Sequence, residues 1–195
     1  MSGLRERKKA RTRSAIQRDA LRLFREQGFA ATTIEQIAEA AEVSPSIVFR
    51  YFATKEDLLA LAEHHSLADA VARAFDAQPP QVPVAAAVRA AIRTALAELS
   101  PDDRAERFER DIALLSVPEL WSANLGVLRT ALDGLGALVA RRAGRDPHDV
   151  AVRAFTGAVL GISVQVFLDA AAHPGGDPAA ALDEALAILE VGLPW

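Results

Sequence analysis

The side chains best suited to chemistry lie in the segment Thr32–Lys55, TTIEQIAEAAEVSPSIVFRYFATK, which reads as two short helices joined by a tight turn. On a helical wheel of about 100° per residue, Val48 and Phe52 of the second helix fall together. Ser46 and Arg50 lie opposite them. An outward face of Pro, Ser, Ile, Phe and Arg suits contact with base edges, sugars and thymine methyls. The alternative is that its aromatic and aliphatic members are partly buried core residues.

The ends of these helices carry residues that favour capping. Two pairs have capping-box spacing at the start of the first helix, Thr33 with Gln36 and Thr32 with Glu35. Ser44 is a favourable N-cap for the second helix, and Pro45 suits its first position because the missing N–H costs nothing there. These signals place the turn at residues 41–43.

Lys55 stands at the start of the next expected helix, which Thr54 caps. Its charge opposes the helix dipole by roughly 0.3–1 kcal/mol. A lysine beside the exposed N–H groups of a helix end is well placed to bind a phosphate. The alternative is an ordinary exposed lysine.

The charge of the chain is distributed unevenly. The net charge is −4, yet residues 1–25 carry nine basic side chains against two acidic ones. A basic end on an acidic body favours a localised anionic partner, most simply nucleic acid. A solvated, frayed N-terminus is the alternative.

Several functional classes are excluded by composition and spacing. The chain has no cysteine, so disulfides, thiolate metal sites and cysteine nucleophiles are absent. His64 and His65 are adjacent and point to different sides of a helix, while His148 and His173 are isolated, so we expect no metal site and no cofactor. We find no phosphate-binding glycine loop and no nucleophile with a supporting base, and therefore expect no enzyme. Without a signal peptide or an apolar run near 18 residues, the sequence predicts a soluble cytoplasmic protein with no membrane partner.

The elements that position these residues are all helical. A first helix is predicted over Ser2–Gly28, and one long helix over Thr54–Ala77 joins two domains, a helix-turn-helix domain of residues 1–53 and a helical bundle of residues 54–195. The bundle helices are predicted over 84–99, 102–116, 118–143, 147–172 and 178–192. This is an all-α fold of about nine helices without an alternating β pattern.

The last two predicted helices are candidates for a homodimer interface. The 147–172 helix is apolar over more than one stripe, and Gly157 and Gly161 add a strip that permits close helix approach. A helix that is apolar nearly all round is buried somewhere in water. Both the core of the domain and a partner helix can bury it.

A family resemblance covers about residues 10–60 without a gap. Its positions are Gly28-Phe29, Thr32-Thr33-Ile34, Ile37-Ala38, Ala41, Val43-Ser44 and Tyr51-Phe52-x-x-Lys55-Glu56-x-Leu58. The segment resembles the TetR family of bacterial transcriptional regulators. The resemblance implies a three-helix DNA-binding domain whose third helix enters the major groove of an operator. It also implies a ligand-binding helical domain and a homodimer whose four-helix interface takes the last two helices of each subunit.

Roles in DNA binding follow from the resemblance residue by residue. Those near the bases fall on Pro45, Ser46, Ile47 and Phe49, and those at phosphates on Thr33, Ser44, Tyr51 and Lys55. Arg50 joins the DNA-binding set from the outward face.

The chain departs from the family pattern in the turn and the third helix. Glu42 stands where glycine is common, so we expect the turn to form without the positive-φ freedom of glycine. Ser46, Ile47 and Phe49 replace the common Gly, Thr and Tyr. Phe49 keeps a ring for a thymine methyl but lacks the hydroxyl. The operator will therefore differ from that of relatives.

A second resemblance lies in scattered pieces of residues 95–190, among them Leu99-Ser-Pro-Asp-Asp-Arg and Gly144-Arg-Asp-Pro147. It is to the subgroup that includes the acyl-CoA-responsive regulator of mycofactocin genes, and it suggests a long acyl-chain or other lipophilic effector. Side chains that could line its cavity are Phe108, Leu115, Trp121, Leu125, Phe155, Gln165 and Phe167. Ordinary core packing is the alternative for each of them.

The function expected from these observations is that of a ligand-responsive repressor that binds a two-fold operator as a dimer. The alternative is a helical small-molecule carrier or enzyme that kept a vestigial DNA-binding domain.

Overall fold

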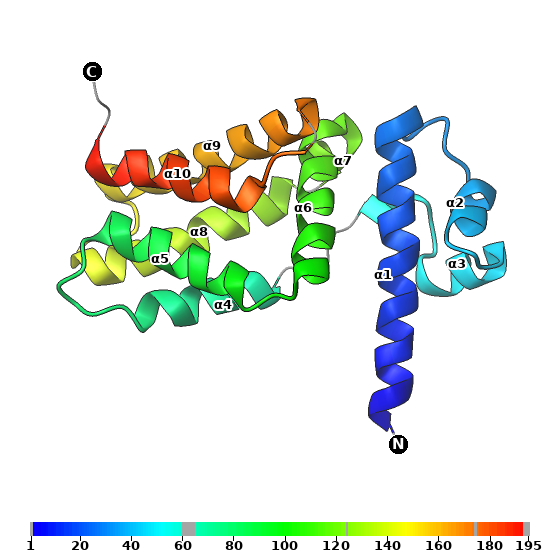
Figure 1. Cartoon of the computed structure of the whole chain (residues 1–195), viewed down its shortest axis with the longest axis horizontal. Coiled ribbons are helices and arrows are strands. Elements are labelled where there is room, and N and C mark those ends of the chain that lie inside the picture. The colour runs from blue at the N-terminus through cyan, green and yellow to red at the C-terminus, as the bar shows by residue number, and fades with distance from the viewer. Residues whose placement is uncertain (1, 60–64, 124, 174, 193–195) are drawn as a thin grey trace. The chain divides into compact units, whose positions relative to one another are not determined.

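The computed structural model describes residues 2–59, 65–123, 125–173 and 175–192. In these ranges it contains ten α-helices, one 3₁₀ helix and no strand (Figure 1). The helices are α1 (Ser2–Gln27), α2 (Ile34–Ala40), α3 (Pro45–Tyr51), η1 (Glu56–Leu59), α4 (His65–Asp76), α5 (Val84–Ala97), α6 (Pro101–Ser116), α7 (Pro118–Ala123), α8 (Leu125–Ala143), α9 (Val150–Ala172) and α10 (Pro178–Val191). The all-α prediction is confirmed.

The segment after α3 differs from the single long helix expected over Thr54–Ala77. Its first described turn is the 3₁₀ helix η1, and α4 begins at His65; the residues between them lie outside the described ranges. Thr54 and Asp57 close a reciprocal capping pair, in which the Thr54 N–H donates to the Asp57 carboxylate at 2.9 Å and the Asp57 N–H donates to the Thr54 hydroxyl at 3.2 Å. The Leu58 N–H donates to the Lys55 carbonyl, three residues back, which is the 3₁₀ pattern.

The expected helix over 118–143 is likewise two helices, α7 and α8, with Asn124 between them outside the described residues. This division raises the described α-helices to ten, against about nine expected.

The chain packs into two compact units. One contains residues Met1–Leu61 with Glu109–Asn124, and the other contains Ala62–Phe108 with Leu125–Trp195. The C-terminal half of α6 and all of α7 therefore belong to the N-terminal unit. This division by packing leaves the functional boundary at residues 53 and 54 a prediction.

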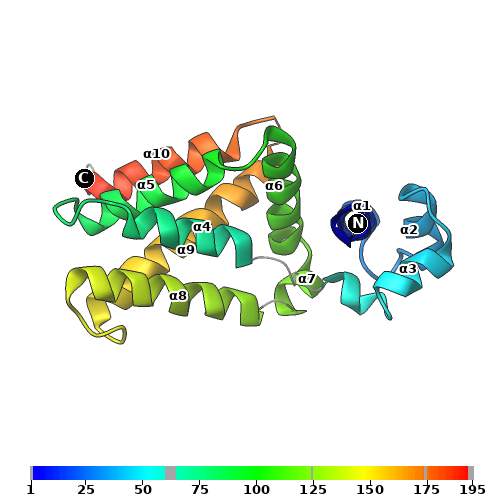
Figure 2. The same cartoon turned by 90° about the horizontal axis from the view of Figure 1, so that it is seen from below.

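The core of the N-terminal unit joins α1 to the two short helices that follow it. Phe24 of α1, Ile37 of α2 and Val48 of α3 are almost completely buried in one cluster, together with Phe52 and Leu58. Figure 2 looks nearly along α1 and shows α2 and α3 side by side on one flank of it. Burying side chains of this size stabilises the unit by about 1.5–3 kcal/mol each. This cluster holds α3 at a constant angle to α1.

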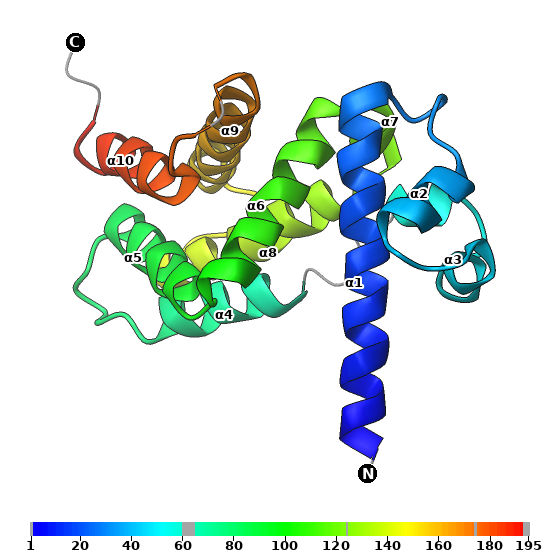
Figure 3. The ribbon, with the colours of Figure 1, turned by 45° about the vertical axis from the view of Figure 1, so that its right-hand side comes forward.

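The second unit is a bundle in which α5 packs between α4 and α10, and α9 packs against α8 and α10 (Figure 3). Arg142 of α8 stabilises the loop between α4 and α5, because its guanidinium donates to the carbonyls of Gln78, Pro79 and Val82. The same group stacks over the Phe75 ring, 5.3 Å from its centroid. The proline-rich break between α4 and α5 thus has a specific partner.

Helix α9 corrects one expectation about membranes. It is long and apolar enough to cross a bilayer by length and composition, although the sequence was expected to hold no such segment. Its polar residues are few and scattered, so they interrupt each apolar run but lower the mean hydropathy of the helix only a little. The core helix of a soluble protein passes the same test, so the finding is weak evidence for a membrane.

Candidate nucleic-acid interface

Helix α2 begins at a complete capping box. The Gln36 N–H donates to the Thr33 hydroxyl at 3.2 Å, and the Thr33 N–H donates to the Gln36 side-chain oxygen at 2.9 Å. Of the two pairs with this spacing, Thr33 with Gln36 is confirmed. Thr32 is instead buried, and its hydroxyl donates to the Gly28 carbonyl at 2.8 Å. The exposed Thr33 hydroxyl keeps its proton for another acceptor.

Gln27, a residue not predicted to act here, ties the end of α1 to this cap. Its side-chain amide donates to the Thr32 hydroxyl at 3.1 Å and to the side-chain oxygen of Gln36 at 3.0 Å. Its place beside the helix-stopping Gly28 is the only sequence signal for this role.

The turn between α2 and α3 is a Schellman motif. The Val43 N–H donates to the Ala38 carbonyl at 2.9 Å, and the Glu42 N–H donates to the Glu39 carbonyl at 3.1 Å. Glu42 itself has φ +54°, and among the described residues no other non-glycine residue has a positive φ. The turn thus forms without glycine, as expected, and Glu42 itself adopts the positive φ that the motif requires, at a cost of about 1–2 kcal/mol.

Helix α3 begins after Ser44 with Pro45 in its first turn, as expected, but the Ser44 side chain forms no capping hydrogen bond. The Ser44 and Ser46 hydroxyl oxygens lie 2.9 Å apart. Both residues are exposed, so this hydroxyl pair is open to a partner outside the protein.

The outward face of α3 has the composition expected from the wheel. Phe49 is 52% exposed, and Ser46 and Arg50 are exposed as well. Ile47 is partly buried, and Val48 is completely buried beneath them. Phe49 is therefore not a core residue. An exposed phenylalanine on the outward face of a short helix suits an apolar contact with a base.

Two of the candidate phosphate-binding residues, Tyr51 and Lys55, have partners within the protein. The Tyr51 ring carries the Arg50 guanidinium, which lies 5.2 Å from the ring centroid. The Lys55 ammonium donates to the carbonyls of Phe29 and Thr32, at 2.8 and 2.9 Å, and lies 4.3 Å from the centroid of the Phe29 ring. Lys55 therefore holds the loop between α1 and α2, with its third N–H left over.

The basic side chains of α1 fall into two groups. Toward its C-terminal end, Arg22 pairs with Asp19 and Glu26, and Arg25 pairs with Glu109. Near its N-terminal end, the side chains of Lys8, Lys9 and Arg11 are exposed. The described positive charge open to a nucleic acid thus gathers on the first part of α1.

The predicted effector-binding residues are divided between the two compact units. Phe108 and Phe167 are buried in the second unit with ring centroids 5.8 Å apart, and Phe155 is packed against the core of that unit. Leu125 is 52% exposed, and Gln165 is exposed and donates to Asp169. Leu115 and Trp121 belong to the other unit. Within the described part of the second unit, the ring contact shown among these side chains is the one between Phe108 and Phe167.

One hollow in the second unit has a different lining. Its volume is about 130 Å³, and it lies against α5, α6 and α10. None of the seven predicted effector-binding residues lines it. Across the described residues, no three His, Asp or Glu side chains are grouped to hold a metal ion.

A short helix pair with a locked turn, an exposed second helix and a basic flank define a helix-turn-helix DNA-binding unit on a helical body. Residues 16–62 match the family described as bacterial regulatory proteins, tetR family, and residues 82–194, more than half of the chain, match the MftR C-terminal domain. The chain belongs to the TetR family of transcriptional regulators, and its C-terminal domain links it to the mycofactocin-regulator subgroup.

Individual relatives agree with this assignment. The chain is 48% identical over 77 residues to the HTH-type transcriptional regulator TcmR of Streptomyces glaucescens, which is 40% of this chain and 34% of TcmR. It is 40% identical over 86 residues to BetI of Rhizobium meliloti, 42% of each chain. The chain spans less than half the length of the curated relatives it matches.

Solved structures share the fold over nearly the whole chain. FadR from Bacillus halodurans has a TM-score of 0.70 at 19% identity, covering 94% of this chain and 96% of that one. SmeT, the repressor of the Stenotrophomonas maltophilia efflux pump SmeDEF, has a TM-score of 0.60 at 26% identity, covering 90% and 88%. These relatives are described as regulators or repressors.

Proposed function

We propose that this protein is a cytoplasmic, ligand-responsive repressor that binds a two-fold DNA operator as a homodimer. The observation that carries the proposal is the α3 surface, where Phe49 and Ser46 are exposed on a helix whose opposite side is locked into the core by Val48. A rigid helix with an apolar ring and small hydroxyls outward can enter a major groove and contact base edges.

The roles proposed for the individual residues are those that the family resemblance implies. Base contacts are proposed for Pro45, Ser46, Ile47 and Phe49, and phosphate contacts for Thr33, Ser44, Tyr51 and Lys55. Arg50 is proposed to contact DNA from the outward face of α3. For Lys55 the phosphate role is shared with the loop, since two of its donors already meet carbonyls. The Thr33 hydroxyl and the Ser44–Ser46 pair retain protons that a phosphate oxygen can accept.

Dimerisation is proposed through α9 and α10. Leu168, Ile188 and Val191 are exposed apolar side chains on these helices, with Val191 at 83%. A Cβ added at Gly157 or Gly161 would meet no atom within 4 Å, so packing inside one protomer does not require glycine there. A partner helix that approaches closely would explain why glycine stands at both positions. Two recognition helices would then lie about 34–36 Å apart, one turn of DNA.

The effector is proposed to be an acyl-CoA or another lipophilic small molecule. The match to the MftR C-terminal domain and the buried Phe108–Phe167 pair support an apolar ligand in the second unit. Effector binding changes DNA affinity only if the ligand prefers one of two conformations. Leu115, Trp121, Leu125, Phe155 and Gln165 are kept as candidates that contact the effector in the conformation it prefers.

The test is fluorescence polarisation with genomic DNA fragments at several salt concentrations. We expect affinity to fall steeply with salt, since phosphate contacts release counterions. Phe49→Ala should lose about 1–3 kcal/mol of preference for the operator over random DNA. The control is Arg129→Ala, which truncates an exposed side chain on α8 of the second unit, outside the proposed DNA-binding, effector-binding and dimer surfaces. Binding that is insensitive to salt, or equal loss of operator preference in both variants, would refute the proposal and favour a carrier or enzyme with a vestigial domain.

A further inference from the structure

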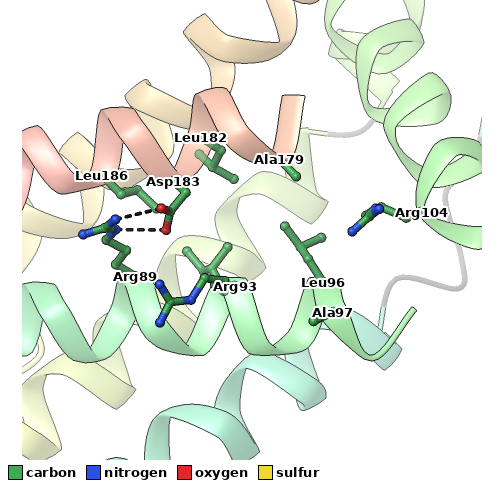
Figure 4. A pocket seen from close by; sticks show the side chains of 10 residues that line it. Arg89, Arg93, Leu96, Ala97, Arg104, Ala179, Leu182, Asp183 and Leu186 are labelled. Carbon is green, nitrogen blue, oxygen red and sulfur yellow. Dashed lines mark hydrogen bonds and ion pairs between the residues drawn. The ribbon is translucent and has the colours of Figure 1, made fainter. Parts of the chain in front are cut away.

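The cleft against α5, α6 and α10 combines apolar walls with an excess of arginine. Leu96 of α5 and Leu182 of α10 are buried side chains in its lining. Figure 4 shows Arg89 and Arg93 toward one end of the cleft and Arg104 of α6 at the other end, with Leu96 lying between Arg93 and Arg104. A cavity with these walls would hold the apolar body of a ligand and present cations to its charged end.

The acids around the cleft are already engaged at the Arg89 end. Arg89 donates to both oxygens of the Asp183 carboxylate, at 2.7 and 2.9 Å, and to Glu190 at 3.3 Å. The two negative charges of Asp183 and Glu190 exceed the one positive charge of Arg89. Arg93 supplies a second positive charge, which acts on Asp183.

Arg104 has no such compensation. Within the described part of the chain, no acidic side chain lies within ion-pair distance of its guanidinium, and Asp103 beside it accepts from the Ser100 hydroxyl at 2.7 Å. The charged residues that line the cleft are Arg89, Arg93, Arg104 and Asp183. Together with Glu190, which Arg89 hydrogen-bonds, they leave one positive charge, placed where α6 meets the apolar wall. A single bound negative charge would balance it.

We propose that this cleft binds a small organic monocarboxylate whose apolar body is about the size of benzene, with the carboxylate on Arg104 and the body against Leu96 and Leu182. The volume of about 130 Å³ is close to that of cavities that accept benzene, which hold about 150 Å³. Arginine suits a carboxylate because its planar fork donates two parallel N–H bonds. The site does not depend on the proposed operator or on the lipophilic effector.

The experiment is ¹⁹F NMR of 4-fluorobenzoate titrated with the full-length protein. We expect saturable binding that Arg104→Gln weakens about tenfold or more, as loss of a charged hydrogen bond does. Ala97→Leu, which fills the cleft without touching a charge, should abolish it and serves as the second test if Arg104→Gln does not fold. Arg129→Gln is the matched control, because Arg129 on α8 is exposed and pairs only weakly with Asp133 at 3.7 Å.

Two further probes decide which part of the ligand is recognised. 4-Fluorobenzyl alcohol, which has the same body without the charge, should bind at least about tenfold more weakly. Inorganic phosphate, which has charge without an apolar body, should not displace 4-fluorobenzoate. Equal binding of the alcohol, displacement by phosphate at equal concentration, or unchanged affinity in both cleft variants would overturn the proposal. Loss of DNA binding in a separate assay would not affect it.

Discussion

The strained turn between α2 and α3 allows a quantitative test. Glu42 is exposed and has φ +54°, a conformation that costs a residue with a Cβ about 1–2 kcal/mol and glycine almost nothing. Glycine also gains about 0.4–1 kcal/mol of conformational freedom in the unfolded chain, which opposes the effect. The difference predicts that Glu42→Gly raises the free energy of unfolding of the N-terminal unit by up to about 1.6 kcal/mol, with about 0.8 kcal/mol from the mid-values.

The assay is urea unfolding followed by tryptophan fluorescence in a Trp195→Phe background. Trp121 then reports alone, and it belongs to the same compact unit as the turn. Glu42→Gln is the matched control, since it removes the charge and keeps the Cβ, and it should leave the midpoint almost unchanged. Equal stabilisation by glycine and glutamine would show that charge and not backbone strain matters. Destabilisation by glycine would refute the reasoning.

Three other outcomes follow from the structure. Lys55→Met should lower the free energy of unfolding by about 1–2 kcal/mol, because it leaves the Phe29 and Thr32 carbonyls without their charged donor, and should weaken binding to all DNA sequences alike. Weaker DNA binding at unchanged stability would contradict the loop role, and Arg129→Met on the second unit is the control. The hydrogen bond from Arg89 lowers the pKa of Asp183 from 3.8. The stabilising effect of the ionised Asp183 is therefore present above pH 3.8 and is lost as the pH falls toward the lower folded pKa. Acid unfolding of Asp183→Asn, followed by circular dichroism, should lack this loss of stability. Ile188→Arg should yield monomers in analytical ultracentrifugation, and an undisturbed dimer would exclude that face of α10 as the interface.

The DNA-reading unit was largely predictable because its signals are local. A capping box needs residues three apart, a proline marks the first turn of a helix, and the wheel of α3 depends on fewer than eight consecutive residues. Thr33 as a cap, Val48 inward and Phe49 outward follow from such spacing, and the structure agrees with each. Family resemblance extended the same reading to the whole fold.

The effector site was not predictable in the same way. Phe108 and Phe167 are 59 positions apart, and their contact depends on how the bundle helices pack. The helix expected over Thr54–Ala77 begins instead with a 3₁₀ turn, which apolar periodicity does not distinguish from the first turn of an α-helix. Apolar patterns identify which side chains are buried but not which neighbours they meet.

What the sequence by itself determined is the helical architecture, the position of the turn and the outward face of α3, because these depend on residues within about four positions of one another. Only the tertiary structure decided the conformation of Glu42 and the use of Lys55. The Lys55 ammonium meets carbonyls 23 and 26 residues earlier in the chain, and that distance is closed by the packing of α1, α2 and η1 around Phe24 and Leu58. A side chain that appeared ready for a phosphate therefore first stabilises the loop that holds the DNA-reading helices together.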